Sequence, residues 1–251
     1  MNLYFLKIFL SLYIIIKMFQ NKLKFLINSN TKNFIYTFPK LIASFPDSVP
    51  KEDILVVVGN SDKIAFTVCD RFCKLEVQHN SLDYTAFIAL LEEESLIQSN
   101  FVIPEFWFYL HDTCELGKEF IPKLSSFIPT LTINKSLTLF PSMNLGVYRH
   151  HFFLQDRQIL LSKRSSNNPP EEEVYQLKCD CVATEDFLFK IENDTPFTGN
   201  SKGMEGTRPR KIYKGVSRIT EYYEVLDLYK YKANWNGISP RDKVSRYKLD
   251  P

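Results

Sequence analysis

A run of nine residues near the middle of the chain, Phe106 to Cys114 (FWFYLHDTC), constrains the fold most strongly. Its first five residues are apolar or aromatic, and a short uninterrupted run of this kind is typical of a strand that is buried on both faces. The run ends in the polar residues His111, Asp112 and Thr113. Because ligands in open α/β sheets bind just outside the carboxyl ends of the strands, the sequence predicts a candidate site at this trio.

Strand and helix patterns alternate on either side of this run. The clearest is Ile54–Val58 (ILVVV), which is β-branched, uninterrupted and followed by a polar turn. The other predicted strands are Lys22–Ser29, Lys74–Gln78 and Asn144–Tyr148, and the predicted helices are Phe38–Phe45, Tyr84–Glu94 and Gly117–Phe127. This alternation predicts an α/β fold with a mostly parallel open sheet and helices on both faces, as in Rossmann-like domains.

We divide the chain into three parts. Residues 1–20 form a hydrophobic segment, residues 21–164 form the α/β domain, and residues 165–251 form an irregular C-terminal extension that we expect to pack on the same domain. Within the extension, the polar, Pro- and Gly-containing stretches 165–173 and 193–210 predict loops. Thr184–Ile191 predicts a short helix capped by Thr184.

The N-terminal segment, residues 3–19, is almost wholly apolar and leaves three interpretations open. It is a membrane anchor, although its uninterrupted part, Ile8–Ile16, is too short to cross a bilayer without carrying a lysine. It is a signal peptide, although no small-x-small cleavage site follows. Or translation begins at Met18, and the segment is not part of the protein. The protein is cytoplasmic or membrane-anchored depending on which of these holds.

Charge and motifs argue against several classes of function. The net charge is only +2, with 31 basic and 29 acidic residues, whereas polyanion binding needs a concentrated basic face, so we expect no nucleic-acid partner. The chain has no G-x-G-x-x-G, P-loop, G-x-S-x-G or H-E-x-x-H motif. Its five cysteines are irregularly spaced and predict neither a disulfide framework nor paired zinc sites.

Polar turns follow three of the predicted strands. Gly59–Asp62 follows the second strand, Asn80–Asp83 follows the third and His111–Thr113 follows the fourth. In a doubly wound sheet, the carboxyl ends of such strands lie at one edge, so we expect the three turns to converge there.

The residue types in these turns suit a nucleotide ligand. Gly59 would allow a ligand to approach the backbone closely, because glycine has no side chain. Asp62 and Asp83 would accept hydrogen bonds from ribose hydroxyls or base amines. Asp112 would bind a hard divalent cation, which neutralises a diphosphate as it becomes a leaving group.

This layout resembles the GT-A family of nucleotide-sugar glycosyltransferases over about residues 22–148. Ile54–Asp62 looks like the family's second strand and the turn near the nucleotide. His111-Asp112-Thr113 stands where the family has a metal-binding D-x-D motif, with His or Thr in place of one carboxylate. Tyr109–Cys114, Ser142–Tyr148 and Leu228–Trp235 are similar to a group of viral and microbial GT-A-like proteins.

The resemblance implies that a sugar is transferred from a nucleotide-diphosphate donor to a carbohydrate or glycoconjugate acceptor. Mn²⁺ or Mg²⁺ would be held by Asp112 with help from His111. Asn144 and Tyr148 would bind the acceptor, and Asp186 would be the general base, with Glu185 as the alternative. The residues expected to bind the nucleotide-sugar are Gly59, Asn60, Asp62, Asn80, Asp83, Thr113, Lys230 and Lys232.

Simpler interpretations stay open for the same residues. His111 can be a histidine at the edge of the core, and Asp112 can cap a helix that starts near Cys114. Asn80 and Asp83 can likewise be helix caps. The aromatic and basic residues between 218 and 235 can simply pack the tail onto the sheet, or bind single-stranded nucleic acid. The alternative functions are therefore a non-catalytic GT-A-like binding protein and, third, a nucleic-acid-associated protein.

Overall fold

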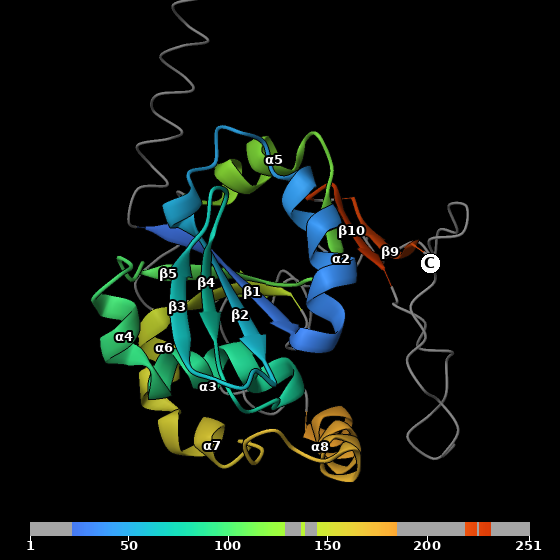
Figure 1. The fold of residues 1–251 in the computed structure, drawn as a ribbon. Coiled ribbons are helices and arrows are strands. Elements are labelled where there is room, and N and C mark those ends of the chain that lie inside the picture. The colour runs from blue at the N-terminus through green and yellow to red at the C-terminus, as the bar shows by residue number, and fades with distance from the viewer. Residues whose placement is uncertain (1–21, 129–136, 139–144, 185–218, 225, 232–251) are drawn as a thin grey trace, which may run out of the picture.

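A seven-stranded mixed sheet forms the centre of the computed structural model, which describes residues 22–128, 137–138, 145–184, 219–224 and 226–231 (Figure 1). The strand order is β3-β4-β2-β1-β5-β8-β7. The parallel strands are β1 (Leu23–Asn30), β2 (Ile54–Gly59), β4 (Cys73–Glu76) and β5 (Phe106–His111). The antiparallel strands are β3 (Ala65–Val68), β7 (Leu137–Thr138) and β8 (Gly146–Arg149), which form the two sides of the sheet.

Helices cover both faces of this sheet. On one face lie α2 (Thr31–Ser44) and α5 (Phe120–Phe127), whose apolar residues join one buried cluster. On the other face lie α3 (Thr85–Glu92), α6 (His150–Gln155) and α7 (Arg157–Leu161), which build a second cluster. The remaining helices are η1 (Lys51–Asp53), η2 (Leu82–Tyr84), α4 (Glu94–Gln98) and α8 (Glu171–Thr184). The predicted fold class, a largely parallel α/β sheet between two helical layers, is confirmed.

The alternation of side chains along β5 explains why the strand is apolar throughout. Phe106, Phe108 and Leu110 belong to the cluster under α2 and α5. Trp107 and Tyr109 belong to the cluster under α3 and α6. Both faces of the strand are therefore buried, because successive residues point to opposite sides of the sheet.

A second, smaller sheet joins the C-terminal part of the chain to the domain. It has the order β6-β10-β9 and consists of β6 (Cys114–Leu116), β10 (Leu228–Tyr231) and β9 (Ile219–Tyr223), all antiparallel. Lys230 of β10 lies opposite Cys114 of β6. Tyr223, Leu226 and Leu228 are buried in the same cluster as the central strands, so these strands pack on the domain through aromatic and aliphatic contacts.

Two helices differ from their predicted bounds. Helix α2 starts at Thr31 rather than Phe38, because the side chain of Asn30 caps it by accepting a hydrogen bond from the Asn33 amide. Pro39 lies inside the helix. Helix α8 (Glu171–Thr184) starts in the stretch that was predicted as a loop. The helix predicted over residues 184–191 lies, after Thr184, outside the described residues. The three glutamates of the first turn of α8 suit the positive end of a helix.

Among the described residues, no helix is both long and apolar enough to cross a membrane. The apolar N-terminal segment, residues 3–19, lies outside these residues.

A buried ion pair closes the amino-terminal side of the sheet. The Lys24 ammonium lies 3.5 Å from the Asp53 carboxylate, donates to the Glu52 carbonyl at 2.9 Å and lies over the Phe101 ring. Only 4% of the Lys24 side chain and 6% of the Asp53 side chain are exposed. Burial raises the pKa of Asp53 by more than Lys24 lowers it, so the cost of removing the carboxylate from water exceeds the attraction to Lys24.

The variant Asp53→Ala should be strongly destabilised, because it leaves the Lys24 charge buried without its partner. We expect a loss of about 3–5 kcal/mol in the free energy of unfolding, measured by urea denaturation. Asp47→Ala is the matched control, since it removes an ion pair with Arg71 that lies at the exposed surface, and it should change stability little. Equal effects of the two variants would contradict this account.

Candidate functional site

An acid and an imidazole meet at the carboxyl edge of the parallel strands. Asp83 lies in η2, which follows β4, and His111 is the last residue of β5. The His111 Nε2 atom lies 3.7 Å from the Asp83 Oδ1 atom, and both side chains are largely buried. This distance is too long for a hydrogen bond, so the two groups lie close together without sharing one.

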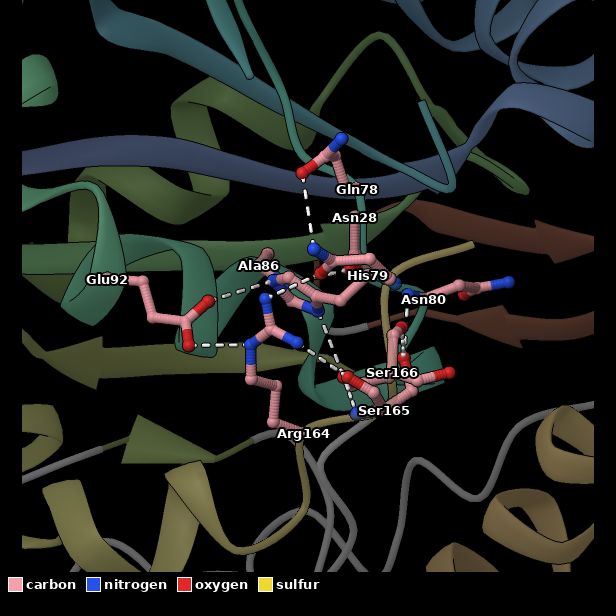
Figure 2. Close-up of polar contacts among 11 residues, drawn as sticks. Asn28, Gln78, His79, Asn80, Ala86, Glu92, Arg164, Ser165 and Ser166 are labelled. Carbon is pink, nitrogen blue, oxygen red and sulfur yellow. Dashed lines mark hydrogen bonds and ion pairs between the residues drawn. The ribbon is translucent and has the colours of Figure 1, made fainter. Parts of the chain in front are cut away.

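Side chains from β1 and β5 fix the position of Asp83. The Asn28 amide donates to the Leu82 carbonyl and accepts from the Ala86 amide, both at 3.0 Å, as Figure 2 shows in part. The Tyr109 hydroxyl donates to the Asp83 carbonyl at 2.7 Å. Since Asn28 is the cross-strand neighbour of His111, these bonds attach η2 to the sheet directly beside the imidazole.

The backbone beside Asp83 is strained. Leu82 has a φ of 53°, a left-handed conformation that side chains with a Cβ rarely adopt. Such a conformation costs about 1–3 kcal/mol and persists only where surrounding contacts enforce it. The bond from Asn28 to the Leu82 carbonyl is one such contact. The position of Asp83 therefore comes with a local loss of stability at Leu82.

Two lysines from distant parts of the chain act on this pair. Burial would raise the pKa of Asp83, but the positive charges of Lys178, of His111 when it is protonated and of Lys230 outweigh burial and lower it. Lys178 belongs to α8, which contacts η2, and Lys230 belongs to β10. We name these four residues, Asp83, His111, Lys178 and Lys230, the edge cluster.

The imidazole of the edge cluster is neutral at pH 7. Burial lowers the pKa of His111 to about 4, Asp83 opposes that effect, and Lys230 and Lys178 reinforce it. The cations that act on Asp83 at this pH are therefore the two lysines. The buried Nε2 atom of His111 has no hydrogen-bond partner among the described residues. The arrangement suits an anion, which would meet two ammonium groups and a neutral imidazole.

Asp112 points away from the edge cluster. Its carboxylate accepts a 2.5 Å hydrogen bond from the Ser29 hydroxyl, on the face of the sheet that α2 covers, whereas His111 faces η2 on the opposite side. The predicted pairing of His111 with Asp112 around one metal ion is therefore wrong, because adjacent strand-end residues point to opposite faces. The alternative as a helix cap is also wrong, since strand β6 begins at Cys114.

Mn²⁺ or Mg²⁺ does not fit the residues expected to bind it. The Asp112 carboxylate is 5% exposed and already accepts from Ser29, so a cation could not reach it without displacing that bond. At the edge cluster, the two lysines would repel a divalent cation. Within the described ranges, no group of three or more His, Cys, Asp or Glu side chains is placed to hold a metal ion.

The other two polar turns meet each other as predicted. The Asn60 amide donates to the His79 carbonyl and the Ser61 amide to the Val77 carbonyl, both at 3.0 Å. A Cβ on Gly59 would lie 2.7 Å from the His79 carbonyl oxygen, so glycine allows this close approach of backbone to backbone. The structure thus explains Gly59 by packing, and its role with a ligand stays a prediction.

The remaining predicted site residues have different outcomes. The backbone amide of Asn60 donates to the His79 carbonyl, and that of Asn80 donates to the Ser165 hydroxyl. Asp62 is exposed on the turn after β2. Thr113 lies in the turn between β5 and β6, where its amide bonds to the Asp112 carboxylate. The described ranges do not include Asn144, Asp186 and Lys232.

Tyr148 cannot bind an acceptor sugar in this arrangement. The side chain is fully buried, and its ring packs against Phe87, Tyr109 and Phe153. The prediction is wrong because Tyr148 faces the α3 side of the sheet, where the cluster between strands and helices is closed.

Asn28 and Lys178 belong to the site but were not predicted from the sequence. Asn28 had a signal, since a buried amide near the end of an apolar strand needs hydrogen-bond partners. The signal for Lys178 was weaker. The Pro-Pro-Glu-Glu-Glu run of residues 169–173 is typical of a helix start, and Lys178 lies in the helix that follows it. Comparison of the sequence with protein-family models and with curated proteins gave no match.

The buried Asp112 carboxyl should make stability depend on pH. Burial raises its pKa from 3.8 to about 6, although hydrogen bonds from Ser29, Thr37 and two backbone amides partly offset this rise. The folded state therefore holds a proton that the unfolded state releases between these values, so the stability that this group contributes is lost as pH rises towards and past 6.

We expect the stability difference between Asp112→Asn and the wild type to move by roughly 2 kcal/mol in favour of Asn between pH 4 and pH 7.5. Chemical denaturation at both pH values measures this change. Asp62→Asn, which makes the same substitution at an exposed position, is the control for the change of side chain itself. A constant difference for Asp112→Asn would show that the carboxyl is not buried as described.

Proposed function

We propose that this chain is a nucleotide-sugar glycosyltransferase whose edge cluster binds the diphosphate of the donor. The observation that carries the proposal is the buried Nε2 atom of His111, which has no hydrogen-bond partner among the described residues at the carboxyl edge of the parallel strands. The positive charges of Lys178 and Lys230, which act on Asp83 and His111, support it. That edge is where open α/β sheets bind their ligands, and a diphosphate is the anionic part of a nucleotide-sugar.

The proposed chemistry needs positive charge at the leaving group. When the bond between the sugar's anomeric carbon and the diphosphate oxygen breaks, the electron pair stays on that oxygen. Lys178 and Lys230 would stabilise the developing charge, and neutral His111 would donate a hydrogen bond from Nε2. Asp83 would be left to accept a hydrogen bond from a hydroxyl or amine of the nucleoside.

The acceptor oxygen would form the new bond to the anomeric carbon and lose its proton to a general base. Asp186 is the residue that the GT-A resemblance suggests for this role. No step of the proposed mechanism passes through a metal ion, because Asp112 and His111 do not share a binding position.

A non-catalytic binding protein is the second candidate, and one observation favours it. Asp112 supplies the carboxylate that matches the family's metal motif, yet it is buried and hydrogen-bonded to Ser29. A GT-A-like protein whose motif carboxylate has become part of the interior could keep nucleotide binding without transfer.

Nucleotide binding should be detectable and should depend on the edge-cluster lysines. We expect UDP or GDP to raise the melting temperature in EDTA as well as in Mn²⁺, and Lys230→Ala to weaken binding about tenfold or more, as the loss of a charge-assisted contact would. Calorimetry measures the dissociation constant. Lys40→Ala is the control, because Lys40 is exposed on α2.

The same protein is then tested against a panel of nucleotide-sugars for release of the nucleoside diphosphate. Release that Lys230→Ala abolishes supports the transferase. Binding without release from any donor favours the non-catalytic protein, and absence of binding with or without Mn²⁺ rejects both.

A further inference from the structure

The segment between α7 and α8 is fastened to the turn that leads into η2. Figure 2 shows this network, which reaches from residues 78–81 and Glu92 on one side to residues 164–167 on the other. We name its central residues, His79, Ser81, Glu92, Arg164 and Ser165, the clamp. It lies outside the edge cluster, but it leads directly into the helix that carries Lys178.

The inner half of the clamp is a closed set of buried hydrogen bonds. The Ser165 amide donates to the Ser81 hydroxyl and the Asn80 amide donates to the Ser165 hydroxyl, both at 2.9 Å. The Ser81 hydroxyl lies 2.9 Å from His79 Nδ1. His79, Ser81 and Ser165 are all at most 2% exposed, so water does not compete for these hydrogen bonds.

The outer half is held by Arg164. Its guanidinium donates to the Glu92 carboxylate at 2.6 Å, to the Ser165 carbonyl at 2.7 Å and to the Asn167 side chain at 2.8 Å. Glu92 is the last residue of α3 and also lies 3.8 Å from His79 Nε2. A single arginine therefore links the end of α3 to two positions of the incoming segment, Ser165 and Asn167.

The clamp does not have the properties of a catalytic triad, although it contains Ser, His and Glu. Ser81 is fully buried, and its oxygen already accepts the Ser165 amide. Burial, reinforced by Arg164, lowers the pKa of His79 to about 4, so the imidazole is neutral at pH 7. These groups are arranged to hold the chain, not to attack a substrate.

Helix α8 begins immediately after the clamp. The amide and hydroxyl of Ser166 both donate to the Glu173 carboxylate at 2.6 Å, and the Val174 amide donates to the Pro170 carbonyl. The first turn of α8 is thereby tied to the residue that follows Ser165. Lys178 lies little more than one turn further along the same helix, where α8 contacts η2.

We propose that Glu92, Arg164 and His79 are positioning residues that hold α8 so that Lys178 stays beside Asp83. The inference uses the edge cluster, and its consequence for a ligand rests on the proposed function. A clamp that only stabilised the fold would leave the electrostatics of the edge cluster unchanged when it is weakened, and that difference makes the proposal testable.

The first measurement is the titration of His111 by NMR, with the signal assigned through His111→Gln. Because the Lys178 charge lowers the pKa of His111, Lys178→Met should raise it. Arg164→Ala should raise it in the same direction, and the double variant should add nothing further, since the lysine has already left its position. Arg164→Lys should restore part of the effect, and Arg157→Ala, an exposed arginine on α7, is the control.

The second measurement is the affinity for inorganic pyrophosphate by calorimetry. Lys178→Met and Arg164→Ala should each weaken binding about tenfold, again without additivity. If Arg164→Ala fails to fold, Glu92→Gln removes the charge of the partner while keeping its size.

The outcomes separate the two proposals. Independent, additive shifts, or a His111 titration that responds to Lys178→Met and not to Arg164→Ala or Glu92→Gln, overturn the positioning role. A His111 titration that behaves as expected, with no pyrophosphate binding in any variant or the wild type, supports the positioning role and overturns the diphosphate assignment.

Discussion

The pleat of β5 decides which of its terminal residues can share a site. Along this strand, even-numbered residues face α2 and α5, and odd-numbered residues face α3. His111 therefore continues the row of Trp107 and Tyr109, and it meets Asp83. Asp112 lies beyond the strand on the other side, where it bonds to Ser29. A rule as simple as the two-residue period of a strand thus separates two neighbours that look like one motif in the sequence.

A few buried polar groups then turn this geometry into a rigid edge. Asn28 and Tyr109 hold the backbone of η2 and force Leu82 into a left-handed conformation, so Asp83 cannot easily drift away from His111. Strain at Leu82 lowers the stability of the fold, but groups that are already in place do not have to be ordered when a ligand binds. A strained residue, Leu82, and buried hydrogen bonds thus occur together at this edge of the sheet.

Local patterns predicted the central strands and the layers well, because apolar runs such as Ile54–Val58 can be buried only in a sheet covered on both sides. The meeting of the turns after β2 and β4 also followed from the sequence, since parallel neighbours end at one edge. The sequence did not predict which face of the sheet each strand residue occupies. Tyr148 was predicted to bind the acceptor and lies in the core, because a strand pattern fixes the alternation of side chains but not which face of the sheet is covered.

Of the two lysines, Lys230 was predicted from the sequence and Lys178 was not. Both belong to segments that are distant in the sequence from Asp83 and His111. Strand β10, which brings Lys230, is paired with β6 from the middle of the chain. During synthesis the earlier strands emerge from the ribosome first, so Asp83 and His111 can meet while the edge of β6 is still uncovered. A nascent chain at that stage has the acid without its cations and exposes an unpaired strand to other chains. The pairing of β10 with β6 therefore both covers this strand edge and adds Lys230 to the site.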